Sequence, residues 1–118
     1  LDMRKIYYLS TCDTCKKILA KINPSSHGFE LQDIKNEKLT SSQLSQMKKL
    51  SGSYEKLFSK RAMLYTTMKL KEKKLSEHEM RDLILEEYTF LKRPVIIFDE
   101  RIFIGNAPKE IETLMNLL

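Results

Sequence analysis

Residues 6–17 read Ile6-Tyr7-Tyr8-Leu9-Ser10-Thr11-Cys12-Asp13-Thr14-Cys15-Lys16-Lys17, and this stretch decides the fold. Aromatic and β-branched residues over 4–9 predict a strand, and apolar residues at helical spacing over 13–22 predict a helix directly after it. Turn residues end that helix, and a second apolar run predicts another strand at about residues 29–34. A strand, a helix and a strand in so short a stretch predict a βαβ unit with parallel strands.

The middle of the chain carries two capping-box patterns. Thr40 is followed three residues later by Gln43, and Ser76 is followed three residues later by Glu79. In each pair the two side chains can satisfy free N–H groups at a helix start. We therefore expect one helix to begin directly after Thr40 and another directly after Ser76.

Other middle-chain signals are less regular. Gly52 is expected to end the first capped helix, and a short helix is expected over 54–58. The second capped helix is expected to continue to about Tyr88. Residues 61–74 mix methionine, leucine and lysine without a clear period.

The end of the chain returns to β-structure. Apolar runs at 95–98 and 101–104 predict two strands, and the two residues between them allow only an antiparallel hairpin. Pro108 predicts the first turn of a final helix. The order βαβ, helices, ββα predicts an α/β protein with a four-stranded mixed sheet, a thioredoxin-like architecture with a helical insertion.

We predict a single domain over residues 1–118. Its two thioredoxin-like halves are expected at about 4–35 and 89–118, with the helical insertion at about 38–88. A hydrophobic content of 42% and a charged content of 31% are ordinary for a globular domain.

The cysteine count and the hydropathy pattern limit the cellular compartments in which the protein is expected. Two cysteines three positions apart cannot cross-link distant segments, which excludes a disulfide-rich secreted scaffold. No apolar run is long enough to span a membrane, and no signal-peptide pattern occurs at the N-terminus. We therefore expect a cytoplasmic protein with no membrane partner.

The formal net charge is +5, and basic residues gather in one part of the chain. Only one aromatic residue, Tyr65, lies among them, and no nucleic-acid motif accompanies them. We interpret the run as a solvated surface and expect no direct nucleic-acid contact. Its members are Lys60, Arg61, Lys69, Lys71, Lys73 and Lys74.

Cys12 lies where the first strand meets the first helix. The free N–H groups and the dipole at a helix start stabilise an anion, so this position favours the thiolate of Cys12. Cys15, one helical turn later, is close enough to attack a mixed disulfide formed on Cys12. The pair therefore indicates thiol chemistry, as a redox switch or as a nucleophile with its resolving thiol.

Two other interpretations of the cysteines were weighed. A zinc site normally needs four ligands, whereas His27 and His78 lie far apart in the sequence, so we expect no metal. Inert buried cysteines are the second alternative, and they fit Cys15 on its helix face better than Cys12 at the junction. No bound cofactor is expected.

Arg93-Pro94 precedes the third predicted strand and has two interpretations. X–Pro is the only peptide bond that readily becomes cis, and a proline is also tolerated at the entry of a strand. The local sequence leaves a cis-proline and an ordinary strand-entry proline equally open.

The sequence resembles the ArsC/Spx family, which contains arsenate reductase-like proteins and Spx-type transcriptional regulators. The resemblance covers Ile6 to about Met115. It rests on segments 11–17, 57–61 and 91–95 and on strands ending in Ile104-Gly105, in this order and spacing.

This resemblance implies roles for particular residues. Cys12 matches the nucleophilic cysteine of the family, Arg61 and Arg93 match two arginines that bind the oxyanion, and Pro94 matches a cis-proline. It also implies a small oxyanion or a thiol adduct as substrate. The implied electron donor is glutathione, a glutaredoxin or a thioredoxin.

The chain departs from the reductases at Ala107, next to Asn106, where they carry a third arginine. Loss of that donor removes a charge-assisted hydrogen bond worth about 1.5–3 kcal/mol. We predict a thiol-dependent oxidoreductase with Cys12 as nucleophile and Cys15 as candidate resolving thiol. The alternative is an Spx-type regulator that binds RNA polymerase through a Cys12–Cys15 disulfide switch, because a CxxC pair is typical of that branch.

Overall fold

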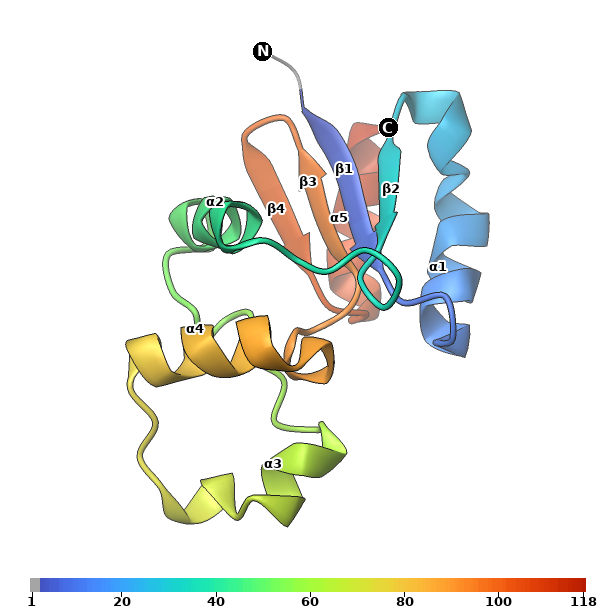
Figure 1. Cartoon of the computed structure of the whole chain (residues 1–118). Coiled ribbons are helices and arrows are strands. Elements are labelled where there is room, and N and C mark those ends of the chain that lie inside the picture. Colours follow the sequence, from blue (N-terminus) through green and yellow to red (C-terminus); the bar gives the residue numbers. More distant parts are fainter. Residues whose placement is uncertain (1–2) are drawn as a thin grey trace. The chain divides into compact units, whose positions relative to one another are not determined.

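The computed structural model describes residues 3–118. Strand β1 (Arg4–Tyr8), helix α1 (Asp13–Ile22) and strand β2 (Glu30–Asp33) follow one another, with a short 3-10 turn, η1 (Pro24–His27), before β2. β1 and β2 pair in parallel, with Lys5 opposite Glu30 and Tyr8 opposite Asp33. The βαβ unit expected from the sequence is confirmed, and each strand is slightly shorter than expected (Figure 1).

The sheet has four strands in the order β2-β1-β3-β4. Strands β3 (Val95–Phe98) and β4 (Arg101–Ile104) form an antiparallel hairpin, and β3 also pairs antiparallel with β1. Asp99 turns the hairpin with a φ of 58°, a left-handed conformation that aspartate tolerates better than most residues. Helix α5 (Pro108–Leu117) follows and has Pro108 at its first position, as predicted. The α/β mixed sheet is therefore confirmed.

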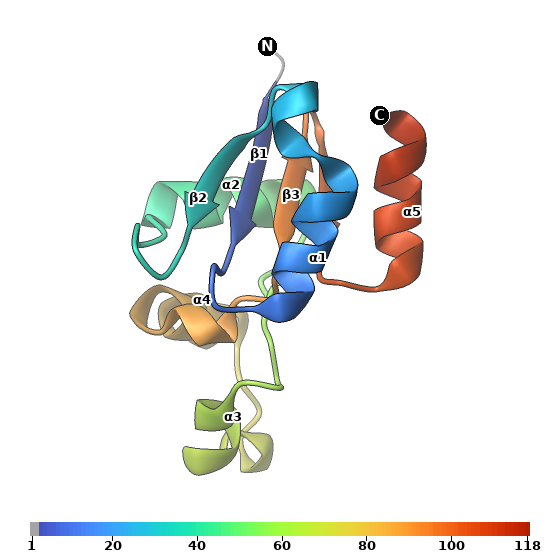
Figure 2. The ribbon, with the colours of Figure 1, turned by 90° about the vertical axis from the view of Figure 1, so that its right-hand side faces the viewer.

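Helices α1 and α5 cover one face of this sheet (Figure 2). Ile6 and Ile96 are opposite each other in the β1–β3 register, and Ile96 faces Phe103 in β4, so their side chains share that face. Burial of these apolar side chains is the main force that holds α1, and therefore its N-terminus, against the sheet. The core consists of Ile6, Ile18, Ile22, Phe29, Ile96, Phe103, Ile111 and Leu114.

The chain divides into two compact units. One combines the residues up to Lys38 with Arg93–Leu118, and the other is Leu39–Lys92. An isolated antiparallel bridge joins Phe58 to Leu91 in the second unit, and the named elements of this unit are all helical. They are α2 (Ser41–Ser51), α3 (Met63–Thr67), α4 (Glu77–Glu86) and two 3-10 turns, η2 (Leu70–Glu72) and η3 (Tyr88–Phe90).

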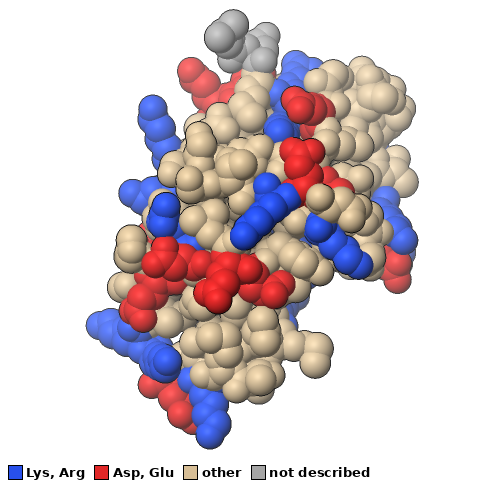
Figure 3. Space-filling model, in the orientation of Figure 1, with Lys and Arg blue, Asp and Glu red and all other residues tan. Residues whose placement is uncertain are grey.

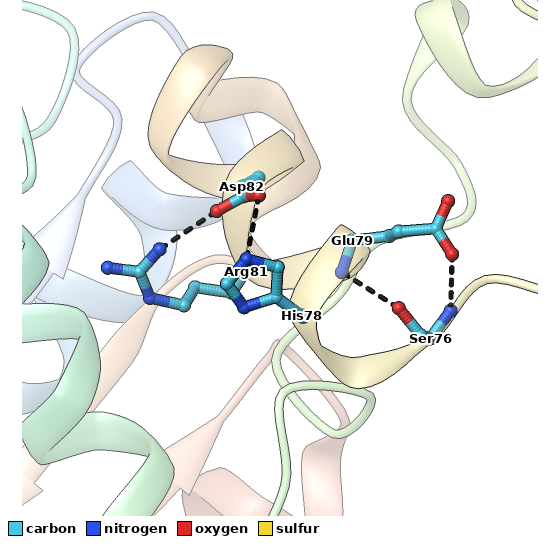
Figure 4. Close-up of polar contacts among 5 residues, drawn as sticks. All are labelled: Ser76, His78, Glu79, Arg81 and Asp82. Atoms are coloured by element: carbon cyan, nitrogen blue, oxygen red, sulfur yellow. Dashed lines mark hydrogen bonds and ion pairs between the residues drawn. The ribbon is translucent and has the colours of Figure 1, made fainter.

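Both capping boxes are present at the expected positions. The Gln43 N–H donates to the Thr40 hydroxyl at 3.0 Å, and the Thr40 N–H donates to the Gln43 side chain at 3.1 Å. Ser76 and Glu79 repeat this exchange, with both distances 3.1 Å, at the start of α4 (Figure 4). Each pair satisfies N–H groups that a helix start leaves free.

The short helix expected over 54–58 is wrong, because residues 54–57 form a bend and turns and Phe58 forms an isolated β-bridge. The carboxylate of Glu77, more than twenty positions away, accepts the N–H groups of Tyr54 at 2.7 Å and of Glu55 at 3.0 Å. The Lys56 N–H donates to the Ser53 hydroxyl. The Leu57 and Phe58 N–H groups donate to the carbonyls three residues earlier, as in turns, and Phe58 then forms an isolated antiparallel bridge with Leu91 that ends the segment. The region without a clear period, 61–74, contains the short α3 and η2.

The second capped helix also ends earlier than Tyr88. α4 stops at Glu86, and the next residue leaves the helical conformation with φ −137° and ψ 112°. The Glu87 carboxylate then accepts the Thr89 N–H and caps η3. Within residues 3–118, no helix has the length and apolar character required to cross a membrane.

Candidate functional site

Cys12 is the N-cap residue of α1, with an extended backbone at φ −96° and ψ 113°. Its carbonyl accepts the Lys16 N–H at 3.1 Å, the first bond of the helix, and its own N–H donates to the Leu9 carbonyl at 3.0 Å. The strand therefore turns into the helix within a few residues. This geometry places the half-buried Cys12 side chain at the positive end of the α1 dipole.

The pKa of the Cys12 thiol is lowered below its ordinary value. Burial alone would raise it, but hydrogen bonds from the backbone and the thiol of Cys15, the positive charge of Arg93 and the Thr14 N–H outweigh burial. The sulfur makes no side-chain capping bond of ordinary length, so these N–H groups act on it as weak contacts. The Cys12 thiolate therefore forms at a lower pH than the thiolate of an ordinary cysteine.

Cys15 has the opposite environment. Its side chain is fully buried, and burial raises the pKa of its thiol from 9.0 to about 11, although a contact with the Leu9 backbone opposes this. The hydrogen bond to the Cys12 sulfur and the negative charge of Cys12 contribute to this raised pKa. The two cysteines are both free thiols in this structure. The pair therefore combines an ionisable, accessible sulfur with a protonated, buried one.

Arg93 and Pro94 lie in the same unit as the cysteines. The Arg93–Pro94 peptide bond is cis, which is the form that the resemblance implies at this position. Pro94 is buried, and its carbonyl accepts the Gly105 N–H at 2.9 Å, where β3 meets the end of β4. The charge of Arg93 acts on both sulfurs. The structure thus brings Arg93 near Cys12 and Cys15.

Arg61 and Ala107 are the two remaining positions singled out from the sequence. Arg61 is exposed in a turn of the unit Leu39–Lys92, so its approach to Cys12 stays a prediction. Ala107 is the N-cap residue of α5 and provides no capping side chain. Among the described residues, no group of three or more His, Cys, Asp or Glu side chains could hold a metal ion.

Asp33 holds the loop before Cys12, and sequence reasoning missed it. One carboxylate oxygen of Asp33 accepts the backbone N–H groups of Ser10 at 3.3 Å and Lys35 at 3.2 Å. The other oxygen accepts the side-chain amide N–H of Asn36 at 2.8 Å. Burial would raise the pKa of Asp33, but these hydrogen bonds lower it below the usual value. The ionised carboxylate therefore joins the end of β2 to the loop that leads into α1.

A local signal for Asp33 was present in the sequence. Aspartate at a strand end, followed by residues that include asparagine, is typical of an Asx-type turn. The Asn36 and Glu37 N–H groups do bond back to the Asp33 carbonyl, at 3.1 and 2.8 Å. The bond to Ser10, 23 positions away, follows only from the parallel pairing of β1 with β2.

The sequence model of the ArsC family matches residues 7–114, and the chain belongs to this family. Among curated proteins, it is 23% identical over 111 residues to the global transcriptional regulator Spx of Lactiplantibacillus plantarum. That alignment covers 93% of this chain and 84% of the regulator.

Solved structures share the fold. A protein related to the ArsC family from Bacteroides fragilis has a TM-score of 0.79 at 24% identity, covering 94% of this chain and 96% of the other. Arsenate reductase from Vibrio cholerae has a TM-score of 0.79 at 14% identity, covering 99% and 98%. At these identities the match shows a common thioredoxin-like fold, whereas activity must be argued from the site.

Proposed function

We propose that this chain is a thiol-dependent oxidoreductase in which Cys12 is the nucleophile and Cys15 the resolving thiol. The observation that carries the proposal is the inequality of the two sulfurs. Cys12 has a lowered pKa and an accessible side chain, whereas Cys15 is buried with a pKa of about 11. A nucleophile must be ionised and accessible, and a resolving thiol must stay protonated until the mixed disulfide exists.

The first step is attack by the Cys12 thiolate on a sulfur of a substrate disulfide. A bond forms between Cys12 Sγ and that sulfur, the substrate S–S bond breaks, and the second sulfur leaves with the electron pair and takes a proton from water. The positive charge of Arg93 lies near the reacting sulfur and can stabilise the negative charge shared by three sulfurs in the transition state.

In the second step Cys15 resolves the mixed disulfide. Once Cys12 is uncharged, the Cys15 thiol no longer donates to a thiolate, so it loses its proton more easily and attacks Cys12 Sγ. The remaining substrate sulfur leaves as a thiolate and is protonated. The substrate has gained two electrons, and the protein has lost two in a Cys12–Cys15 disulfide. Two external thiols, from glutathione or from a glutaredoxin or thioredoxin, restore the reduced pair.

The substrate of these two steps is a disulfide or a related thiol adduct, and a small oxyanion is the alternative substrate that the family resemblance implies. Arg93 supplies one guanidinium near Cys12, and Arg61 is the proposed second donor. Ala107 provides no charge at the third position, so a disulfide or thiol adduct, which needs fewer donors than arsenate, suits this pocket better. We also propose that the protein works in the reducing cytoplasm, where Cys12 stays available as a thiolate.

The proposal is tested by turnover of a glutathione mixed disulfide, coupled to the consumption of NADPH through glutathione reductase. Cys12→Ser should abolish turnover. Cys15→Ser should still form the mixed disulfide on Cys12, which then accumulates and is detected as an adduct by mass spectrometry. Turnover that survives Cys12→Ser, or no turnover with glutathione, glutaredoxin or thioredoxin, would overturn the proposal.

The second candidate is a redox-sensing transcriptional regulator. It is favoured by the likeness to the regulator Spx, which extends over 93% of this chain. In that case the Cys12–Cys15 disulfide changes binding to RNA polymerase and no substrate is turned over. Purified RNA polymerase should then be retained by the oxidised and the reduced protein to different extents. Equal retention, together with turnover in the coupled assay, would eliminate this candidate.

A further inference from the structure

The net charge of the chain comes from one segment of the second unit, residues 60–74, which we call the basic segment. The segment contains six of the 21 lysine and arginine residues and one of the 16 acidic residues, Glu72. The rest of the chain has fifteen residues of each sign, so the formal charge of +5 equals the charge of this segment alone. The six basic residues are Lys60, Arg61, Lys69, Lys71, Lys73 and Lys74.

The basic segment presents its cations and two large apolar side chains to the solvent. All six basic residues are exposed, and no ion pair among residues 3–118 includes any of them. Met63 is 85% exposed and Met68 is 45% exposed. Methionine side chains are flexible and polarisable, so they adapt to varied apolar surfaces. The basic segment therefore offers apolar contact and positive charge within fifteen consecutive residues.

Contacts inside the second unit hold the segment in place. Ala62 and Leu70 are buried, and the Tyr65 ring packs edge-on against Phe58 at 6.1 Å between centroids. Lys69 adopts a left-handed conformation at φ 54°, which turns the chain between α3 and η2. The exposed side chains are therefore carried on an anchored backbone, which lowers the entropy lost on binding.

Next in the sequence comes a region of opposite sign. Residues 77–87 contain five acidic side chains and Arg81, a formal charge of −4. The capping box of Ser76 and Glu79 fixes the start of α4 (Figure 4). Glu77 and Glu79 both lie in the first turn of this helix. Figure 3 shows a band of red side chains across the part of the molecule where Figure 1 draws α4, with blue side chains and a tan area below the band.

We propose that the basic segment binds a protein partner whose contact surface is acidic around an apolar centre. The lysines would steer and orient the acidic groups, and Met63 with Met68 would pack on the apolar centre. This interaction goes beyond the thiol chemistry and does not require Cys12.

The neighbouring acidic region argues for a protein rather than another polyanion. A nucleic acid or an anionic membrane presents negative charge over its whole surface, so it would be repelled by residues 77–87 as it approached the basic segment. The one aromatic ring of the segment, Tyr65, is engaged with Phe58 and not free for base stacking. A protein surface can alternate in sign and match both regions.

The test uses a synthetic amphipathic peptide with a glutamate face and a leucine face, labelled for fluorescence anisotropy. Duplex DNA and phosphatidylglycerol vesicles are the competing probes. The charge variant is Lys71→Glu with Lys73→Glu, and its matched control is Lys35→Glu with Lys38→Glu, two exposed lysines of the other unit with the same change in net charge.

The charge variant should weaken peptide binding about tenfold, while its matched control changes binding little. Met63→Ser should weaken peptide binding about threefold, because an apolar contact is lost. Its control is Leu31→Ser, at a residue on β2 that is 45% exposed, and this change should leave peptide binding unchanged. Cys12→Ser should bind the peptide as well as the unchanged protein, so this result is separate from the fate of the oxidoreductase proposal. Equal loss in the two lysine variants would overturn the inference, as would binding of DNA or vesicles at least as tight as that of the peptide.

Discussion

Cys12 and Cys15 are three positions apart, yet helix geometry puts them in different surroundings. Position 12 precedes the first turn of α1 and is half-exposed, whereas position 15 lies on the face of α1 that packs into the fold. The Cys15 thiol donates to the Cys12 sulfur, so each residue changes the pKa of the other in opposite directions. The chemistry of Cys12 therefore depends on a buried neighbour as well as on the helix dipole.

Replacement of Cys15 tests this coupling. Cys15→Ala removes the thiol hydrogen bond, so the pKa of Cys12 should rise and its rate of alkylation by iodoacetamide at neutral pH should fall about threefold to tenfold. Ile18→Val is the control, because it removes a similar buried volume from the same helix without touching either sulfur. An unchanged rate in Cys15→Ala would show that the helix start alone activates Cys12.

At the scale of elements, the loop between β1 and α1 is held by a side chain of another element, because Asp33 at the end of β2 accepts the Ser10 N–H. Asp33→Ala should free the Ser10 N–H and loosen the turn that carries Cys12, at a cost of about 0.5–1.5 kcal/mol of unfolding free energy. Amide hydrogen exchange should quicken at Ser10 and Thr11. Glu79→Ala, which removes a comparable carboxylate from the start of α4, should quicken exchange there and leave the Cys12 loop unchanged.

Elements with local signals could be predicted from the sequence, and those set by distant side chains could not. Both capping boxes, the βαβ unit and the β3–β4 hairpin depend on residues a few positions apart, and all were found. The turns over 54–58 depend on Glu77, which no local pattern links to Tyr54.

In the candidate site, too, residues with a local signal could be predicted and residues placed by the tertiary fold could not. Cys12 was identified from the strand–helix junction, because the N-cap position is a local feature. The role of Asp33 depends on the register of β2 against β1, which the predicted βαβ unit does not define, and the charge of Arg93 at the sulfurs depends on how β3 returns beside β1. Both are consequences of the tertiary fold, so residue spacing alone could not give them.

At the scale of the whole molecule, two buried protons make the fold sensitive to alkali. Burial raises the pKa of Cys15 from 9.0 to about 11, and burial with the charges of Glu30 and Glu37 raises that of Tyr7 from 10.0 to about 12. The unfolded chain releases these protons at their ordinary values, so the folded protein binds more protons between pH 9 and pH 12. Stability must therefore fall as the pH rises through this window.

Urea denaturation at increasing alkaline pH measures this loss, which we expect to be roughly 3–5 kcal/mol over the window. The Tyr7 hydroxyl is buried and has no hydrogen bond among the described residues, so Tyr7→Phe should cost little at neutral pH and flatten the upper part of the decline. Tyr8→Phe, at the half-buried neighbour, is the control. A stability that is constant up to pH 12 would contradict the burial of both protons.

The most direct test of the account is a titration of the two thiolates by their ultraviolet absorbance, with Cys12→Ser and Cys15→Ala used to assign each step. Cys12 should ionise below its ordinary pKa of 9.0, and Cys15 should ionise near pH 11. Arg93→Gln should move the Cys12 step to higher pH, because the charge that favours the thiolate is lost. A Cys12 step at or above pH 9.0 would contradict the central claim that this site is built around an activated thiolate.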